Sequence, residues 1–220
     1  MNHFFKINER IYFFIKYQSV YLYMRKPEFT KEKIIKASSS LFNTKGYKTT
    51  SLSDITAATG YTKGAIYSHF ENKDNLEIEA FESMIKSVLI TLKLKIKTAK
   101  NAKEKLFIFL SHFENYTNNQ DVIGGCPLLN LAIEVDDTNF EIKKRAQNAL
   151  CIFKESIITI LKNGKKFGEI KTTVNEELVA SILIASLEGG IMMSKLTHTD
   201  QDIKNVMLHL KSWIEKDILQ

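Results

Sequence analysis

One short run of the sequence, residues 50–76, joins two helix patterns through a glycine. Leu52 and Ile55 are spaced to give a first helix one apolar face. Gly60 follows at the point where the chain has to turn sharply, because glycine adopts positive φ without steric cost. Thr62 then has a side chain that can cap the free N–H groups of a new helix. The run therefore predicts a helix, a tight turn and a second helix.

The second helix of this run has an inward and an outward face. Ile66 and Phe70 are four residues apart, and we expect both to point inward. Lys63 and Tyr67, also four apart, share another face with Thr62. A cation, a phenol and a hydroxyl at a helix N-terminus suit phosphates and base edges in the major groove of DNA. The pattern thus indicates a helix that reads DNA.

Composition indicates that the rest of the chain is helical as well. The 220 residues, 44% of them hydrophobic, can bury one core of ordinary size or a small domain beside a larger one. With only two prolines and nine glycines between long stretches rich in Lys, Glu, Ile and Leu, the sequence predicts an all-α fold. The formal charge of +6 suits a polyanionic partner, although a lysine excess alone is weak evidence.

The cysteines and the N-terminal residues bear on where the protein resides. Cys126 and Cys151 are too few for the disulfide framework of a small secreted protein, so we expect free thiols in the cytoplasm. Residues 1–24 are an aromatic and basic extension in which no apolar run reaches the roughly 18 residues of a spanning helix, so no membrane partner is predicted. A secretory signal fits poorly, because Lys16 interrupts the apolar segment and no small-residue cleavage site follows. One interpretation is an extension without a specific function. Because Met24 precedes the organised region, we hypothesise that translation begins at Met24, which the intact mass of the native protein would test.

Apolar periodicity divides the chain into three short helices followed by longer ones. The short helices are expected over residues 30–45, 52–59 and 63–69, with Gly46 closing the first. The first of the longer helices is expected to begin at Lys73, with apolar residues at four-residue steps as far as Leu92. Gly164 is expected to end a later one. The remaining long helices are expected around 106–113, 127–135, 139–163, 175–196 and 200–219. We place a three-helix unit over residues 25–72 and a larger helical unit over 73–220.

The chain resembles the tetracycline-repressor (TetR) family of bacterial transcription regulators, most strongly over residues 30–76. The residues at matching positions of the family signature are Thr50, Ile55, Gly60, Thr62, Lys63, Gly64, Tyr67, His69, Phe70, Lys73 and Leu76. The chain departs from the family at Thr56 and Thr59, where alanine is usual, and at Tyr61, where valine is usual. The resemblance implies a helix-turn-helix DNA-binding domain over 25–72 and an effector-binding and dimerisation domain over 73–220.

The same resemblance implies roles for individual residues. The residues that it implies for DNA binding are Thr50, Ser51, Thr62, Lys63, Gly64, Tyr67, His69 and Lys73. Thr62 and Lys63 are the candidates for base contacts, and Gly64 would let the backbone come close to DNA. The others are candidates for phosphate contacts. The alternatives are a surface role for His69 and a packing role for Tyr67.

By this resemblance the protein is a homodimeric repressor that binds a palindromic operator in double-stranded DNA and is released by a small apolar or electrophilic effector. Effector binding would favour a spacing of the two DNA-binding units that no longer matches the operator. The alternatives are a ligand-responsive activator and a helical interaction module without specific DNA binding. An enzyme is not expected, because nucleophile-elbow, phosphate-loop and zinc-protease motifs are missing; neither a metal nor a cofactor is predicted.

A second local resemblance concerns residues 124–135, which are similar to a Gly-Cys-Pro-Leu segment of quinone-, electrophile- and flavonoid-responsive repressors. Cys126 precedes Pro127 at an expected helix N-terminus, where the helix dipole favours the thiolate and therefore reactivity. The alternative is that Cys126 is a small buried apolar residue. Cys151, in mid-helix between Leu150 and Ile152, is expected to be structural.

Two further sets are assigned by residue type. The candidates for effector binding or sensing are Cys126, Phe109, Phe113, Tyr116, Leu129, Glu134, Phe153, Glu188 and Met192, for which core packing is the alternative. The last two helices are apolar around much of their circumference, which favours packing on a second copy. The residues predicted for that dimer interface are Leu183, Leu187, Gly190, Ile191, Ile203, Met207, Leu210 and Ile214, with packing inside one chain as the alternative.

Overall fold

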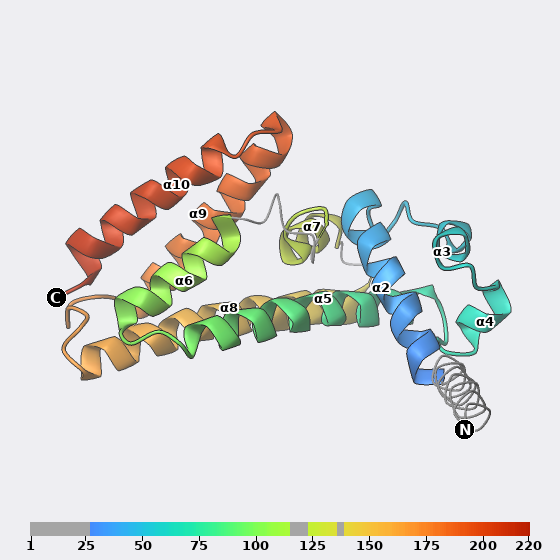
Figure 1. The fold of residues 1–220 in the computed structure, drawn as a ribbon, viewed down its shortest axis with the longest axis horizontal. Helices are drawn as coiled ribbons and strands as arrows, with labels where there is room; N and C mark the ends of the chain where they lie inside the picture. Colours follow the sequence, from blue (N-terminus) through green and yellow to red (C-terminus); the bar gives the residue numbers. More distant parts are fainter. Residues whose placement is uncertain (1–26, 115–122, 136–138) are drawn as a thin grey trace, which may run out of the picture.

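The computed structural model describes residues 27–114, 123–135 and 139–220 (Figure 1). The expectations for residues 1–24 and for Tyr116 lie outside these described residues. The described part of the chain forms helices and no sheet, with one isolated antiparallel bridge between Ile170 and Leu219. The all-α prediction is confirmed.

The helices follow one another in two groups. The first group, called the head below, contains α2 (Pro27–Lys45), α3 (Leu52–Thr59) and α4 (Lys63–Tyr67). The second group, called the body, contains α5 (Lys73–Ile96), α6 (Ala102–Glu114), α7 (Pro127–Glu134), α8 (Phe140–Lys166), α9 (Glu176–Thr197), α10 (Gln201–Trp213) and the π-helical turn η2 (Ile214–Ile218).

Local sequence signals account for the helix ends of the head. Gly46 follows α2 with a φ of +98°, as expected for the residue that closes a helix. Ser51 caps α3 in a capping box with Asp54, each side chain bonding the backbone N–H of the other. Gly60 then turns the chain with a φ of +73°. The predicted helix, turn and helix are therefore present.

In the body, α5 and α8 are long helices that run side by side (Figure 1). The stripe of α5 from Leu76 to Leu92 is buried at its predicted four-residue steps. α7 is short and contacts α2, α5 and α8, so it lies where head and body meet. One apolar core runs from Ile34 in the head to Ile218 at the end of the body, so the body fixes the position of the head through α2.

Gly164 does not end its helix as predicted. α8 continues to Lys166, and Gly164 is buried where Ile170 and Ala102 approach so closely that a Cβ would overlap both side chains. Gly168, with a φ of +70°, lies just past the end of α8. Gly164 is needed for close packing, which a sequence pattern cannot distinguish from a helix end.

Cys151 is exposed, so the expected structural role inside the fold is wrong. Its neighbours Leu150 and Ile152 are exposed as well, at 40% and 45%, because this face of α8 points away from the core. Consecutive apolar residues in a helix point to different sides of it, so a cysteine between two apolar neighbours is not shown to be buried.

One described helix, α9, is long and apolar enough to cross a membrane by length and composition alone. It packs against α6, α8 and α10, and its residues Leu183 and Leu187 are fully buried among them. A core helix of a soluble protein passes the same test, so one such helix is weak evidence for a span.

Candidate DNA interface and effector region

The outward face of α4 is open, as the sequence predicts. Thr62, Lys63 and Gly64 are exposed at the start of the helix, and Tyr67 is 49% exposed one turn later. The Thr62 hydroxyl caps the helix by accepting a hydrogen bond from the Ala65 N–H at 3.2 Å. A Cβ on Gly64 would meet nothing within 4 Å, so another molecule can approach the backbone closely there.

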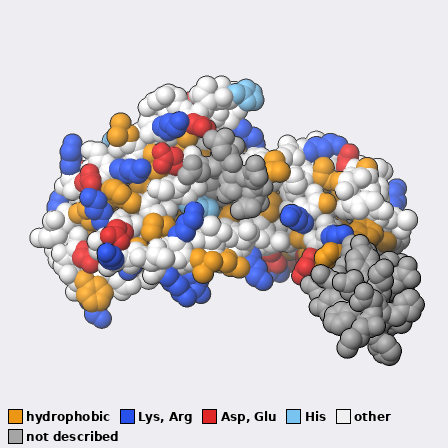
Figure 2. Space-filling model, in the orientation of Figure 1, with side chains coloured by type: hydrophobic (Ala, Val, Ile, Leu, Met, Phe, Trp, Pro, Cys, Tyr) orange, Lys and Arg blue, Asp and Glu red, His pale blue; other side chains and the backbone are white. Residues whose placement is uncertain are grey.

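The opposite face of α4 holds the helix on the head. Ile66 and Phe70 are 1% and 2% exposed and belong to the core. The predicted inward and outward faces are therefore both present. Basic side chains are spread over head and body on the face that Figure 2 shows, with acidic side chains among them. Net charge alone does not locate the interface on that face.

Two residues predicted to bind phosphate are engaged inside the chain. Thr50 is fully buried, and its hydroxyl donates to the Gly46 carbonyl at 2.6 Å, so its side chain cannot reach DNA. The Lys73 ammonium donates to the Tyr47 carbonyl at 2.8 Å and pairs with Glu77 at 2.9 Å. The structure contradicts the prediction for the Thr50 side chain and assigns Lys73 an internal partner.

Besides Tyr67, which is exposed, two more phosphate candidates from the sequence, Ser51 and His69, have only local contacts. Ser51 is exposed, but its N–H and hydroxyl both donate to the Asp54 carboxylate, at 2.7 and 2.6 Å. His69 is half-buried, with its ring centroid 6.4 Å from that of Phe70. A hydrogen bond from Lys45, and then those from Ser51, hold the pKa of Asp54 well below its usual range. The start of α3 is therefore fixed to the end of α2 by an ionised cap.

Glu134 lies at the junction of head and body and not in an effector cavity. Its carboxylate accepts hydrogen bonds from the backbone N–H groups of Tyr47, at 2.8 Å, and Lys48, at 3.2 Å. Gly46 adjoins the same carboxylate. The predicted role in effector binding is contradicted, because Glu134 ends α7 and α7 packs on the head.

Three polar side chains continue this junction into the body. Asn43 of α2 donates to the Gly125 carbonyl at 2.9 Å, and Asn130 of α7 donates to the Asn43 side-chain oxygen at 2.9 Å. Lys195 of α9 donates to the Gly124 carbonyl at 2.9 Å and to the Asn130 side-chain oxygen at 3.2 Å. This set, called the Asn43–Lys195 network below, joins α2, α7 and α9. Sequence reasoning missed it because its members are 65 or more positions apart and match no motif.

Three of the predicted effector residues do lie together. Phe109 and Phe113 of α6 have ring centroids 5.1 Å apart, and Phe153 of α8 is 6.5 and 6.2 Å from them. All three rings are buried against one another. Leu129 is half-buried against the same core, whereas Met192 is 44% exposed on α9. The aromatic cluster is therefore a packed part of the core.

Cys126 does not have the electrostatic environment that its sequence position predicts. It is the N-cap residue of α7, but its thiol is 2% exposed and donates to the Glu188 carboxylate at 2.9 Å. Burial, together with Glu188, raises the pKa of Cys126 well above its usual value, and burial also raises the pKa of Glu188. The thiol is the favoured form, so the expected thiolate is contradicted and the packing alternative agrees with the structure.

The predicted dimer residues are also buried, but inside one chain. Leu183, Leu187, Gly190, Ile191, Ile203, Met207, Leu210 and Ile214 all belong to the buried class. A Cβ on Gly190 would lie 2.9 Å from the Ile203 side chain, so α9 and α10 pack closely here. The alternative of packing within one chain holds for these positions. The described residues include no group of three or more metal-ligating side chains.

Known proteins provide the context for this geometry. Residues 34–80 match the family model described as bacterial regulatory proteins of the tetR family, and residues 102–210 match the tetracyclin repressor-like C-terminal domain. The crystal structure of a TetR transcriptional regulator from Chloroflexus aurantiacus J-10-FL is 34% identical and superposes with a TM-score of 0.85, over 89% of this chain and 99% of that one. The chain belongs to the TetR family.

Two curated relatives are less similar in sequence than the regulator from Chloroflexus aurantiacus J-10-FL. The fatty acid metabolism regulator protein of Bacillus subtilis (strain 168) is 24% identical over 72% of this chain and 79% of its own length. The HTH-type transcriptional repressor DhaR of Mycobacterium sp. (strain GP1) is 23% identical over 76% and 82%. TetR proteins are DNA-binding transcription regulators and not enzymes, they bind small-molecule effectors and dimerise, and in general they are soluble and cytoplasmic.

Proposed function

We propose that this TetR protein is a cytoplasmic homodimeric repressor that binds a palindromic operator through α4 and is released by a small apolar effector. The open face of α4 is the observation that carries the proposal. Thr62, Lys63 and Tyr67 are exposed there and no ion pair of the described residues involves Lys63. These groups are therefore available to base edges and phosphates.

We keep the division into a DNA-binding domain over residues 25–72 and an effector-binding and dimerisation domain over 73–220. The two family matches, at 34–80 and 102–210, support this division. α5 begins at Lys73, directly after the head, and α7 contacts the head through Glu134. A shift of α5 or α7 on effector binding would therefore change the spacing of the two heads.

The dimer that the proposal needs uses the exposed face of α9. Its apolar and small side chains repeat at helical spacing on that side, and we call them the α9 stripe. The stripe consists of Leu178, Ile182, Ala185, Gly189, Met192 and Leu196. A Cβ on Gly189 would meet nothing within 4 Å, so the face is open in the single chain. The heads of the dimer would enter major grooves about 34 Å or a multiple of it apart.

Repression is favoured over activation by the relative DhaR, which is named a repressor. An electrophilic effector is less supported, because the Cys126 thiol is buried and donates a hydrogen bond to the Glu188 carboxylate. An apolar effector suits a body in which one surface hollow, between α5 and α8, has a mainly apolar lining.

Fluorescence anisotropy with DNA from the region upstream of the protein's own gene tests the proposal. We expect tight binding that excess unrelated DNA does not displace. Lys63→Gln should weaken this binding about tenfold or more, since a good base contact contributes about 1–3 kcal/mol. Lys162→Gln is the matched control, because Lys162 is exposed near the C-terminal end of α8. Equal weakening by both variants would show that α4 does not read the operator.

A further inference from the structure

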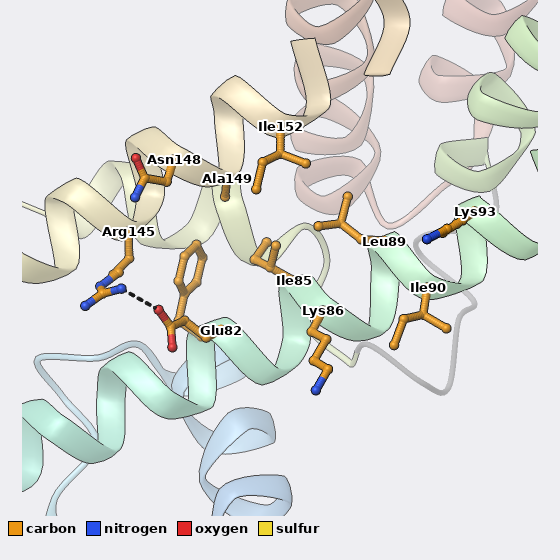
Figure 3. A pocket seen from close by; sticks show the side chains of 11 residues that line it. Glu82, Ile85, Lys86, Leu89, Ile90, Lys93, Arg145, Asn148, Ala149 and Ile152 are labelled. Carbon is orange, nitrogen blue, oxygen red and sulfur yellow. Dashed lines mark ion pairs between the residues drawn. The ribbon is translucent and has the colours of Figure 1, made fainter. Parts of the chain in front are cut away.

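A groove runs between α5 and α8 on the outer side of the body (Figure 3). Its volume is about 410 Å³, within the range of small-molecule sites. Phe81, Ile85 and Leu89 line it from α5, and Ala149 and Ile152 line it from α8. None of the effector residues predicted from the sequence is among its lining residues.

The groove and the aromatic cluster lie on different sides of α8. Ile152 is 45% exposed and lines the groove, whereas the next residue, Phe153, is 3% exposed and packs on Phe109 and Phe113. The groove is therefore separate from the core that the sequence suggested as an effector site. It is accessible without unpacking that core.

The charges around the apolar floor are unequal. Arg145 and Glu82 form an ion pair at 3.1 Å at the end of the groove nearer the head (Figure 3). Lys86 and Lys93 of α5 also line the groove, and neither has an ion-pair partner among the described residues. Among the described lining residues, three cations and one carboxylate leave two positive charges without a counter-charge.

The positions of Lys86 and Lys93 along α5 relate them to the apolar floor of the groove. They are seven residues apart on α5, which places them on one side of the helix about 10 Å apart. Lys93 lies at the end of the groove beside Leu89, opposite the end that Arg145 and Glu82 occupy (Figure 3). From Glu82 to Lys93 the groove follows α5 for about 16 Å. An elongated apolar ligand could therefore lie along the floor with an anionic end at Lys93.

We propose that this groove is the effector site and that it binds an amphipathic anion, an aliphatic carboxylate whose chain lies on Ile85, Leu89 and Ile152. The proposal rests on the function proposed above and names the chemical class of the effector. Burial of the chain supplies the affinity, since apolar area removed from water dominates such binding. The lysines determine which sign of ligand charge is accepted. An exposed ion pair between a lysine and the ligand's carboxylate contributes little affinity, but the positive lysines repel a cationic head group.

The position of the groove connects it to the head. α5 leads directly out of the head, and α8 contacts α7, which carries Glu134 and Asn130. A ligand whose hydrocarbon chain inserts between α5 and α8 would move one helix relative to the other. The Glu82–Arg145 ion pair bridges the two helices and lies at the head end of the groove, where such a movement would be transmitted.

Isothermal titration calorimetry of the full-length protein with decanoate and with decyltrimethylammonium, both below their micelle concentrations, tests the inference. We expect one decanoate per protomer, bound at least tenfold more tightly than the cation of equal chain length. Lys93→Glu should weaken decanoate at least fivefold and strengthen the cation. Ile152→Glu should abolish decanoate binding, and because Ile152 is largely exposed the variant should fold.

Matched controls separate the groove from general effects of charge. Lys162→Glu changes an exposed lysine elsewhere on α8, and Ile133→Glu changes an isoleucine of α7 that is 71% exposed. Both should bind decanoate as the wild type does. Absence of decanoate binding, equal affinity for anion and cation, or binding that survives both groove variants would overturn the inference. Operator binding without ligand, measured by anisotropy, is retained if only this inference is wrong and absent if the proposed function is wrong.

Discussion

At the scale of single residues, the entry into α7 depends on Gly124. Its φ is +102°, and a Cβ there would lie 2.5 Å from the carbonyl oxygen of Asn43. Its own carbonyl accepts hydrogen bonds from Asn130 and Lys195. One glycine thus allows both the left-handed turn and the close approach of α2 that the Asn43–Lys195 network needs.

Gly124→Ala should destabilise the protein by roughly 2–4 kcal/mol, because the strain of a left-handed alanine adds to the overlap with Asn43. Gly168→Ala is the matched control: its φ is +70°, but a Cβ there would meet nothing within 4 Å. Gly168→Ala should lower the free energy of unfolding only by the strain of the left-handed alanine, about 1–2 kcal/mol. Urea unfolding at one protein concentration measures both. Equal costs would show that the approach of Asn43 is not tight.

Residue-level predictions from the sequence succeed where the partner is close along the chain. The left-handed Gly60 and the cap from Thr62 to Ala65 depend on neighbours within one turn, and both are present. Thr50 and Glu134 differ. Glu134 finds its partners 87 and 86 positions away, and the burial of Thr50 follows from how α2 and the turn after it pack. A side chain's type does not indicate such distant partners.

At the scale of elements, α7 serves as the connection between head and body. It is a helix of 8 residues whose last residue, Glu134, binds the turn after α2. Its residue Asn130, four positions earlier and therefore on the same face, binds Asn43. The position of the head relative to the body thus depends on polar contacts of α7 as well as on apolar packing of α2 against α5.

Glu134→Ala should leave the N–H groups of Tyr47 and Lys48 without their carboxylate acceptor. A hydrogen bond to a charged group contributes about 1.5–3 kcal/mol, so local opening should become more frequent by roughly tenfold or more. Hydrogen exchange followed by mass spectrometry would show faster exchange in the peptide containing these amides. Glu155→Ala, at an exposed position of α8, is the control. Unchanged exchange in the Glu134 variant would mean that this contact does not hold the turn.

Helix positions were largely predictable, because apolar residues at four-residue steps report which side of a helix is buried when only one side is apolar. α5 satisfies this condition, and its stripe is buried as expected. α9 does not, since it is apolar on two sides. The sequence therefore predicted that α9 has more apolar surface than one core-facing side needs, and this is the case. The residues chosen for the outer side, such as Leu187 and Ile191, are instead buried within the chain.

At the scale of the whole molecule, α9 faces both the core and the surface. Leu183 and Leu187 are fully buried within the chain, while the α9 stripe leaves Leu178 and Leu196 57% and 73% exposed. An exposed apolar face of this length on a helix is typical of a protein interface. Covering it by a second copy would bring two heads into one particle, as a palindromic operator requires.

Ala185→Glu places a charge in the middle of the α9 stripe, where an isologous interface would bring two copies of it together. We expect a monomer by size-exclusion chromatography with light scattering, and operator affinity at least tenfold weaker because a monomer presents one head. Thr159→Glu, on the exposed side of α8, should stay dimeric. Leu187→Ala, in the core, should instead cost about 2–5 kcal/mol of unfolding free energy. A dimeric Ala185→Glu variant would place the interface on another face and remove the α9 stripe from the proposal.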